Sequence, residues 1–129
     1  MRKGVRELVE EAHAMVMTHD VADAMELADD ASVVFVDVRD HVEIDTHGKI
    51  PGAVHASRGM LEFHLDPASP FHIDVLGSAQ RLVFYCAGGG RSILAARTAI
   101  EMGCEEVAHI GGGLGAWLEA GGPIEKGNG

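Results

Sequence analysis

The chain is poor in cysteine and in positive charge, and each shortage argues against a class of protein. It has 129 residues with two cysteines, Cys86 and Cys104. A domain of this size in a reducing compartment does not need a structural disulfide, so we expect both thiols to be free. Ten Lys and Arg stand against 20 Asp and Glu, a formal net charge of -10. Nucleic acids and anionic membranes bind basic surfaces, so neither is an expected partner.

Long apolar runs are also missing. None approaches the ~20 residues needed to cross a bilayer, which predicts a soluble protein. The first 16 residues, MRKGVRELVEEAHAMV, start basic but place Glu and His among their apolar positions. This stretch lacks the apolar segment of a secretory signal, so we expect a cytoplasmic protein. The length favours one domain over residues 1–129.

The strongest patterns along the chain alternate between helix and strand. Apolar residues at helical spacing predict an N-terminal helix from about Val5 to Ala14 and a second helix that begins near Val21, capped by Thr18 or Asp20. Apolar runs predict strands at residues 32–38, 81–86 and 105–110, and helices are expected at 92–103 and 114–121. This alternation predicts an α/β domain with a mainly parallel sheet.

The segment from 40 to 72 has weaker patterns and holds three of the four prolines. We expect a short helix near 41–46, a turn at Gly48, a short strand at 53–55 and a helical turn around 59–64. At the other end, residues 125–129 (EKGNG) are expected to form a loose tail.

The stretch LVFYCAGGGRS, from Leu82 to Ser92, joins a predicted strand to a predicted helix through three glycines. Ligands of parallel sheets bind at the carboxyl ends of the strands, and Cys86 stands at such an end. Glycines let successive N–H groups turn inward, and the helix start near Ser92 adds its positive end. Such a loop favours an anion and lowers the pKa of a thiol below its usual ~8.5. We therefore interpret Cys86 as a nucleophile; the alternative is a small buried residue in a tight turn.

Other interpretations of these features are weaker. Cys104 precedes a strand without a glycine loop or a helix start, and we expect it to be structural. A Walker loop requires a lysine before its Ser or Thr, whereas Arg91 precedes Ser92. The second glycine cluster, IGGGLGAW, does not match the dinucleotide-binding pattern G-x-G-x-x-G.

Four blocks of the chain together resemble the rhodanese-like sulfurtransferase family. In chain order they are VVFVDVRD, GKIPGAVH, YCAGGGRS and GGGLGAWLEAGGPIE. The resemblance implies a rhodanese-like α/β fold in which helices flank a mainly parallel central sheet on both faces. It covers about residues 18–125 as the domain core and leaves residues 1–17 as an N-terminal helical extension.

The resemblance also implies an activity centred on Cys86. This residue would take a sulfane sulfur from a small anionic donor such as thiosulfate, become a persulfide, and pass the outer sulfur to a thiol or cyanide acceptor. The residues expected to bind the donor are Ala87, Gly88, Gly89, Gly90 and Arg91. No metal or organic cofactor is required. Many relatives carry a cationic side chain inside this loop, and its absence here predicts that thiosulfate is a poor donor.

Several charged residues are candidates for supporting roles. Arg58, in the segment ASRGMLEF, either reaches the pocket or is a solvated or structural arginine. We favour Arg91 as a brace of the loop carbonyls over a direct contact with substrate. Asp37 and Arg39, in the D-V-R block, are expected to tie the strand end to neighbouring loops, with Ser92 as a further support at the helix start.

Five of the eight histidines lie between residues 41 and 72, but none has the helical H-x-x-x-H spacing and no cysteine joins them. We therefore expect no metal site. His55 or His72 is a candidate to line the pocket and move protons. Surface positions are expected for His41, His47 and His64, and Trp117 is expected to anchor the last helix on the sheet.

Two other functions stay open at this point. A persulfide carrier or sensor, loaded by a sulfur-relay partner such as a cysteine desulfurase, would use the same loop with little turnover of small donors. A rhodanese-fold phosphatase or arsenate reductase would have five residues between the cysteine and the arginine, whereas four separate Cys86 from Arg91. The shorter loop fits sulfur.

Overall fold

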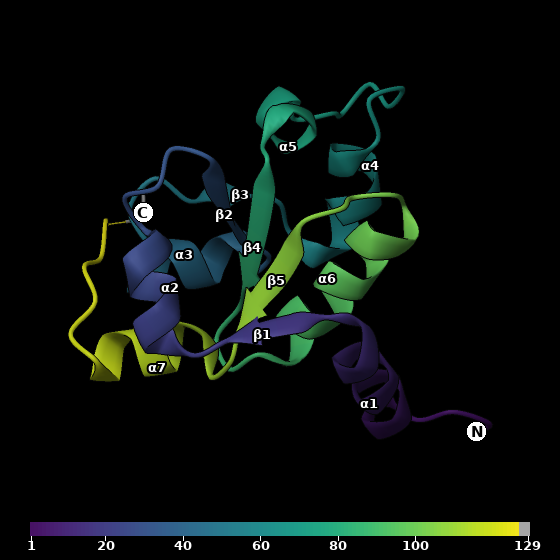
Figure 1. Cartoon of the computed structure of the whole chain (residues 1–129), viewed down its shortest axis with the longest axis horizontal. Coiled ribbons are helices and arrows are strands. Elements are labelled where there is room, and N and C mark those ends of the chain that lie inside the picture. The colour runs from purple at the N-terminus through teal and green to yellow at the C-terminus, as the bar shows by residue number, and fades with distance from the viewer. Residues whose placement is uncertain (127–129) are drawn as a thin grey trace.

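The computed structural model describes residues 1–126 and shows a five-stranded sheet covered by helices on both faces (Figure 1). The strands lie in the order β1-β5-β4-β2-β3, and all their pairings are parallel. The strands are β1 (Met17–His19), β2 (Val33–Asp37), β3 (Val54–His55), β4 (Arg81–Tyr85) and β5 (Val107–Ile110). The predicted α/β class with a parallel sheet is confirmed.

The helices are α1 (Val5–Met15), α2 (Val21–Leu27), α3 (His41–His47), α4 (Leu61–Leu65), α5 (Asp74–Ser78), α6 (Gly90–Glu101), α7 (Gly113–Glu119) and the 3-10 turn η1 (Arg58–Met60). Of the two candidate caps of α2, Asp20 fills the role, because its side chain accepts the N–H of Asp23 at 2.9 Å. The sequence patterns missed β1 and α5. Both are short, and neither carries an apolar run or a helical repeat of its own.

Alternate residues of the central strand β4 point to opposite faces of the sheet. Leu82 and Phe84 pack in a core with α1, α4 and α6, while Val83 and Tyr85 pack in a second core with α2 and α7. Trp117 of α7 is fully buried in the second core, edge-on to Phe35 at 6.2 Å between ring centroids. The expected flanking helices on both faces are thus present, and Trp117 anchors the last helix as predicted.

The N-terminal segment before α2 supplies both a covering helix, α1, and an edge strand of the sheet, β1. Helix α1 packs against α6, and β1 extends the sheet by pairing Thr18 with His109 of β5. Near the other terminus, the backbones of Lys49 and Glu125 form a bridge with N–H to O distances of 2.9 and 2.8 Å. Glu125 is therefore held in place rather than loose, and residues 127–129 of the expected tail lie outside the described residues.

The carboxyl edge of the sheet brings three loops together. The loops that follow β2, β4 and β5 leave the sheet at this edge, and the N–H of Val38 donates to the carbonyl of Tyr85 at 3.1 Å. Across residues 1–126, no helix has both the length and the apolar character needed to cross a membrane. The site described next lies at this edge, as the sequence predicted for a parallel sheet.

Candidate active site

Cys86 directly follows β4 and is 1% exposed. We call residues 86–91 the Cys86 loop. The chain turns back at Gly89, which has φ +113° and caps the N-terminus of α6. This left-handed conformation favours glycine, and it lets the N–H of Gly89 donate to the Cys86 Sγ at 3.1 Å. The loop thus wraps its own backbone around the sulfur.

Opposing effects set the pKa of the Cys86 thiol. Burial raises it, but hydrogen bonds from the Ser92 hydroxyl and from the N–H groups of Ser92, Gly89 and Gly88 outweigh burial. The net result is a pKa below the ordinary value. Cys104 differs, because burial alone raises its pKa. Both cysteines are free, and their surroundings make Cys86 the better nucleophile.

The start of α7 holds the Cys86 loop from behind. The N–H of Leu114 donates to the Cys86 carbonyl at 2.8 Å, and the N–H of Gly115 donates to the Ala87 carbonyl at 3.1 Å. Gly113 has φ +56°, and a Cβ there would lie 2.5 Å from the Cys86 carbonyl oxygen. The second glycine cluster of the sequence is therefore the support of the first, which the sequence patterns did not reveal.

Ser92 and His109 lie beneath the loop. The Ser92 hydroxyl donates to the Gly89 carbonyl at 3.1 Å and also lies 3.1 Å from the Nδ1 of His109. The sequence placed His109 in a strand without a role, since a lone histidine in an apolar run carries no signal of its partners. Its position follows only from the pairing of β4 with β5 and from the packing of α6.

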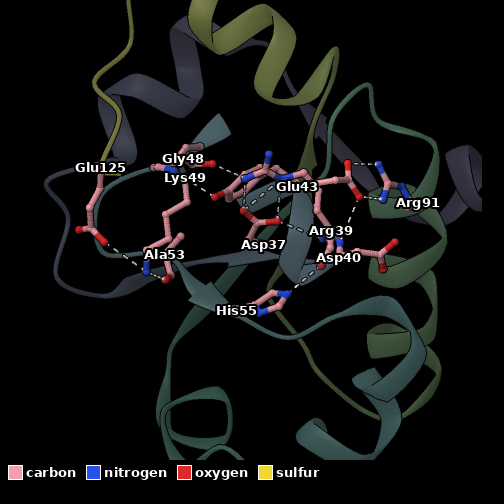
Figure 2. A network of polar contacts seen from close by, with 12 residues as sticks. Asp37, Arg39, Asp40, Glu43, Gly48, Lys49, Ala53, His55, Arg91 and Glu125 are labelled. Atoms are coloured by element: carbon pink, nitrogen blue, oxygen red, sulfur yellow. Dashed lines mark hydrogen bonds and ion pairs between the residues drawn. The ribbon is translucent and has the colours of Figure 1, made fainter. Parts of the chain in front are cut away.

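Arg91 forms a two-pronged ion pair with Glu43 of α3, at 2.6 and 3.0 Å between guanidinium nitrogens and carboxylate oxygens (Figure 2). The expected bond to loop carbonyls is replaced by this link, because the side chain extends across to α3. The Arg91 guanidinium lowers the pKa of Glu43 to about 2. Glu43 also completes the capping box of α3 with Asp40. An acidic residue three positions after Asp40 is the one local pattern from which a fixed position of the Glu43 side chain could have been predicted.

Asp37 and Arg39 form a buried pair at the end of β2, with side chains 0% and 1% exposed and 2.7 Å between Arg39 Nη2 and Asp37 Oδ2 (Figure 2). The same Nη2 donates to the Gly48 carbonyl at 2.6 Å. Burial works against the Arg39 charge, but its bonds to Asp37 raise the pKa overall. The pair links the strand end to the loop after α3.

The structure does not bring the Arg58 guanidinium to the Cys86 loop. It lies 3.1 Å from a carboxylate oxygen of Glu62 and 3.2 Å from the hydroxyl of Thr98. Thr98 is eight residues after the start of α6 at Gly90, which is about 12 Å along the helix. Of the two expectations for Arg58, the structural one matches these contacts.

His55 and His72, the two histidines that were candidates to line the pocket, hydrogen-bond backbone carbonyls. His55 Nε2 lies 2.7 Å from the Arg39 carbonyl, and His72 Nδ1 lies 3.0 Å from the His64 carbonyl. His41 and His47 are exposed as expected, whereas His64 is half-buried. Within residues 1–126, no group of three His, Cys, Asp or Glu side chains is placed to hold one metal ion.

Comparisons with known proteins agree with this fold and site. The model of the rhodanese-like domain family matches residues 20–120, and the chain belongs to that family. A protein of unknown function from Rhodopseudomonas palustris, described as a possible tyrosine phosphatase, is 49% identical with a TM-score of 0.93, covering 97% of this chain and 96% of its own.

Two further relatives have sulfur transfer in their names. The polysulfide-sulfur transferase homodimer of Wolinella succinogenes is 27% identical with a TM-score of 0.69, covering 93% of this chain and 85% of its own. The thiosulfate sulfurtransferase/rhodanese-like domain-containing protein 3 of Mus musculus is 30% identical over 97 residues, which is 71% of this chain. The match spans 62% of the length of that mouse protein.

Proposed function

We propose that the protein is a sulfurtransferase that carries sulfane sulfur as a persulfide on Cys86. The observation that supports this most is the Cys86 sulfur itself, whose pKa is lowered although the residue is buried. A thiolate held by backbone N–H groups is ready to attack sulfur and can stabilise the persulfide that follows. Membership of the rhodanese-like family and the sulfur transferases among the relatives support the same assignment.

In the first half-reaction, the Cys86 thiolate attacks the outer sulfur of a donor. With thiosulfate, a bond forms between the Cys86 Sγ and this sulfur, and the S–S bond of thiosulfate breaks. Its electron pair leaves with sulfite, and the protein keeps an anionic persulfide. The N–H groups of Gly88, Gly89 and Ser92 converge on the Cys86 sulfur, so they are placed to receive this charge.

The second half-reaction restores the enzyme. A thiolate or cyanide attacks the outer persulfide sulfur, the S–S bond on Cys86 breaks, and the electron pair returns to the Cys86 Sγ. The acceptor leaves as a persulfide or as thiocyanate. Because the protein alternates between two covalent states, ping-pong kinetics are expected.

The charges around the Cys86 loop favour a donor other than thiosulfate. Arg91, which belongs to the loop, is paired with Glu43. Arg58 and Arg39 are paired with Glu62 and Asp37 away from the loop. This leaves the loop N–H groups to bind an anion. The reacting group of a small or protein persulfide carries one negative charge, whereas thiosulfate and polysulfide carry two, so a persulfide depends less on side-chain cations and we rank it higher as a donor.

The test is intact mass measurement of the reduced protein after incubation with thiosulfate, mercaptopyruvate, polysulfide or cysteine persulfide. One added sulfur atom is expected, most rapidly with cysteine persulfide, and it should vanish in Cys86→Ser. The Cys104→Ser protein is the matched control, because it removes the other thiol and should load like the wild type. If no donor leaves sulfur on the wild type, the proposal fails.

A persulfide carrier loaded by a sulfur-relay protein is the second candidate. The pairing of Arg91 with Glu43 favours it, because a loop without a free cation would load poorly from small anions. Rapid loading by a cysteine desulfurase together with slow turnover of every small donor would support it. Multiple turnovers with polysulfide and a thiol acceptor would exclude it in favour of the enzyme.

A phosphatase is the third candidate, supported by the description of the Rhodopseudomonas palustris relative. Two features oppose it. Four residues separate Cys86 from Arg91, a loop shorter than the phosphate-binding form, and the Arg91 guanidinium is held by Glu43. Hydrolysis of an aryl phosphate that is lost in Cys86→Ser would restore this candidate.

A further inference from the structure

A row of three hydrogen-bonded polar side chains extends from the Cys86 loop, in which Ser92 and His109 are buried and Thr18, at the far end, is exposed. The His109 residue is 2% exposed, with Nδ1 3.1 Å from the Ser92 Oγ and Nε2 3.0 Å from the Thr18 Oγ1. These three residues come from β5, α6 and β1. Buried polar groups cost free energy unless they are paired, and here each hydrogen-bonds its neighbour in the row.

The hydrogen bonds assign the proton of the His109 ring. The Ser92 hydroxyl has one hydrogen and donates it to the Gly89 carbonyl. The Ser92 oxygen must then accept from Nδ1, which carries the ring proton, while Nε2 accepts from the Thr18 hydroxyl. A neutral ring fits this pattern, because burial, with His13 and His19 nearby, lowers the pKa of His109 to about 4.

The Ser92 hydroxyl is linked to the Cys86 sulfur through Gly89. It donates to the Gly89 carbonyl at 3.1 Å, and the Gly89 N–H donates to the Cys86 Sγ at 3.1 Å. The Ser92 side chain is also among the causes that lower the pKa of the thiol. If the proton of His109 lay on Nε2 instead, the free Nδ1 would compete with the Gly89 carbonyl for the single Ser92 hydrogen.

We propose that His109 is a positioning residue for Cys86, holding the Ser92 oxygen through Nδ1–H so that the Ser92 hydroxyl keeps Gly89 where its N–H reaches the sulfur. In this tautomer the Thr18 hydroxyl supplies the hydrogen-bond partner of Nε2. Thr18 precedes residues 20–120, which match the family, so the N-terminal segment takes part in the site as well as in the sheet. The inference rests on the proposed reactivity of Cys86, and it concerns how that thiolate is stabilised.

The groups that face His109 come from three elements. His13 of α1 lies edge-on at 5.9 Å between ring centroids, His19 of β1 is the other nearby ring, and Ser92 of α6 is the bonded partner. Protonation of either neighbouring histidine would add charge beside the row. His13→Gln is therefore the matched control, because it removes the ring nearest His109 and leaves both hydrogen bonds of His109 in place.

The test is the rate of Cys86 alkylation by iodoacetamide as a function of pH, in a Cys104→Ser background. His109→Asn keeps a donor near the Nδ1 position, whereas His109→Gln places its amide nearer Thr18, and Thr18→Val removes the hydroxyl at similar volume. We expect His109→Gln and Thr18→Val to react about three- to tenfold more slowly at pH 7, with the midpoint at higher pH, because less thiolate is present. His109→Asn and His13→Gln should stay close to the background protein.

Folding of each variant is checked by circular dichroism and thermal unfolding. A folded His109→Gln with an unchanged alkylation profile overturns the proposal, as does His109→Asn slowed as much as His109→Gln. If neither His109 variant folds, the Thr18→Val protein is the test. An unchanged pH midpoint of alkylation in that protein also overturns the proposal. Alkylation needs no sulfur donor, so this result is separate from the persulfide measurement on the wild type.

Discussion

At the scale of single residues, the charges beside the Cys86 loop are paired within the protein. Arg91 and Glu43 are the clearest case, with side chains 40% and 29% exposed. Their bond joins the start of α6 to α3, two elements that approach the site from different parts of the chain. Removing one partner therefore tests a link between elements as well as an ion pair.

Glu43→Gln should lower the free energy of unfolding by about 1 kcal/mol at pH 7, a small value because the pair is partly exposed. The pKa of Glu43 is lowered from its ordinary 4.5 to about 2. Such a group stabilises the fold fully above the unfolded pKa and loses this effect as the pH falls toward the folded pKa. The gap between wild type and variant should therefore shrink below about pH 4.5.

Urea unfolding at several pH values measures this gap. Glu10→Gln is the control, because Glu10 belongs to an exposed pair with Arg6 and should have almost no effect at any pH. A gap between wild type and Glu43→Gln that stays constant as the solution is acidified would show that the carboxylate charge is not the source of the stabilisation.

At the scale of elements, the Cys86 loop depends on the turn that begins α7. Gly113 and Gly121 both have positive φ, +56° and +80°. A Cβ at Gly113 would lie 2.5 and 2.7 Å from the carbonyl oxygens of Cys86 and Ala87, whereas a Cβ at Gly121 would have nothing within 4 Å. The two positions share a backbone conformation and differ in contact with the loop.

Gly121→Ala should cost about 1 kcal/mol through backbone strain alone, with no change in Cys86 alkylation. Gly113→Ala should cost more, about 3 kcal/mol, because the loop must also move. That movement shifts the N–H groups around the sulfur, so alkylation at pH 7 should slow at least severalfold. Thermal unfolding and alkylation of both variants check this, and equal alkylation rates would contradict it.

At the scale of the whole molecule, the net charge of -10 opposes the approach of anions to the loop. The N–H groups act over a few ångströms, whereas the net charge acts over the whole surface and is screened by salt. We expect alkylation of Cys86 by iodoacetate to rise about twofold between about 20 and 200 mM salt.

Iodoacetamide is the matched uncharged reagent, since it reacts at the same carbon. Its rate should change little with salt, so the ratio of the two rates isolates the electrostatic effect. A ratio that falls with added salt would mean that a local positive field outweighs the net charge. The same field acts on thiosulfate, which carries two negative charges.

Much of the fold was predictable from local patterns. The strand at 81–86 and the helix at 92–103 combine long apolar runs with clear ends, and both appear within two residues of their expected limits. β1 could not be predicted, because its three residues become a strand only by pairing with β5. For the site, Cys86 and its glycines were visible because the nucleophile and its hydrogen-bond donors are adjacent in sequence.

The sequence by itself determined the alternation of strands and helices, the α/β class and the cysteine loop at a strand end, because each depends on neighbouring residues. The tertiary structure alone decided which distant groups meet that loop. It paired Arg91 with Glu43, set Gly113 against the Cys86 carbonyl, and placed His109 between Ser92 and Thr18. Such contacts join residues up to 91 positions apart, and the order of the strands creates them, which no local pattern contains.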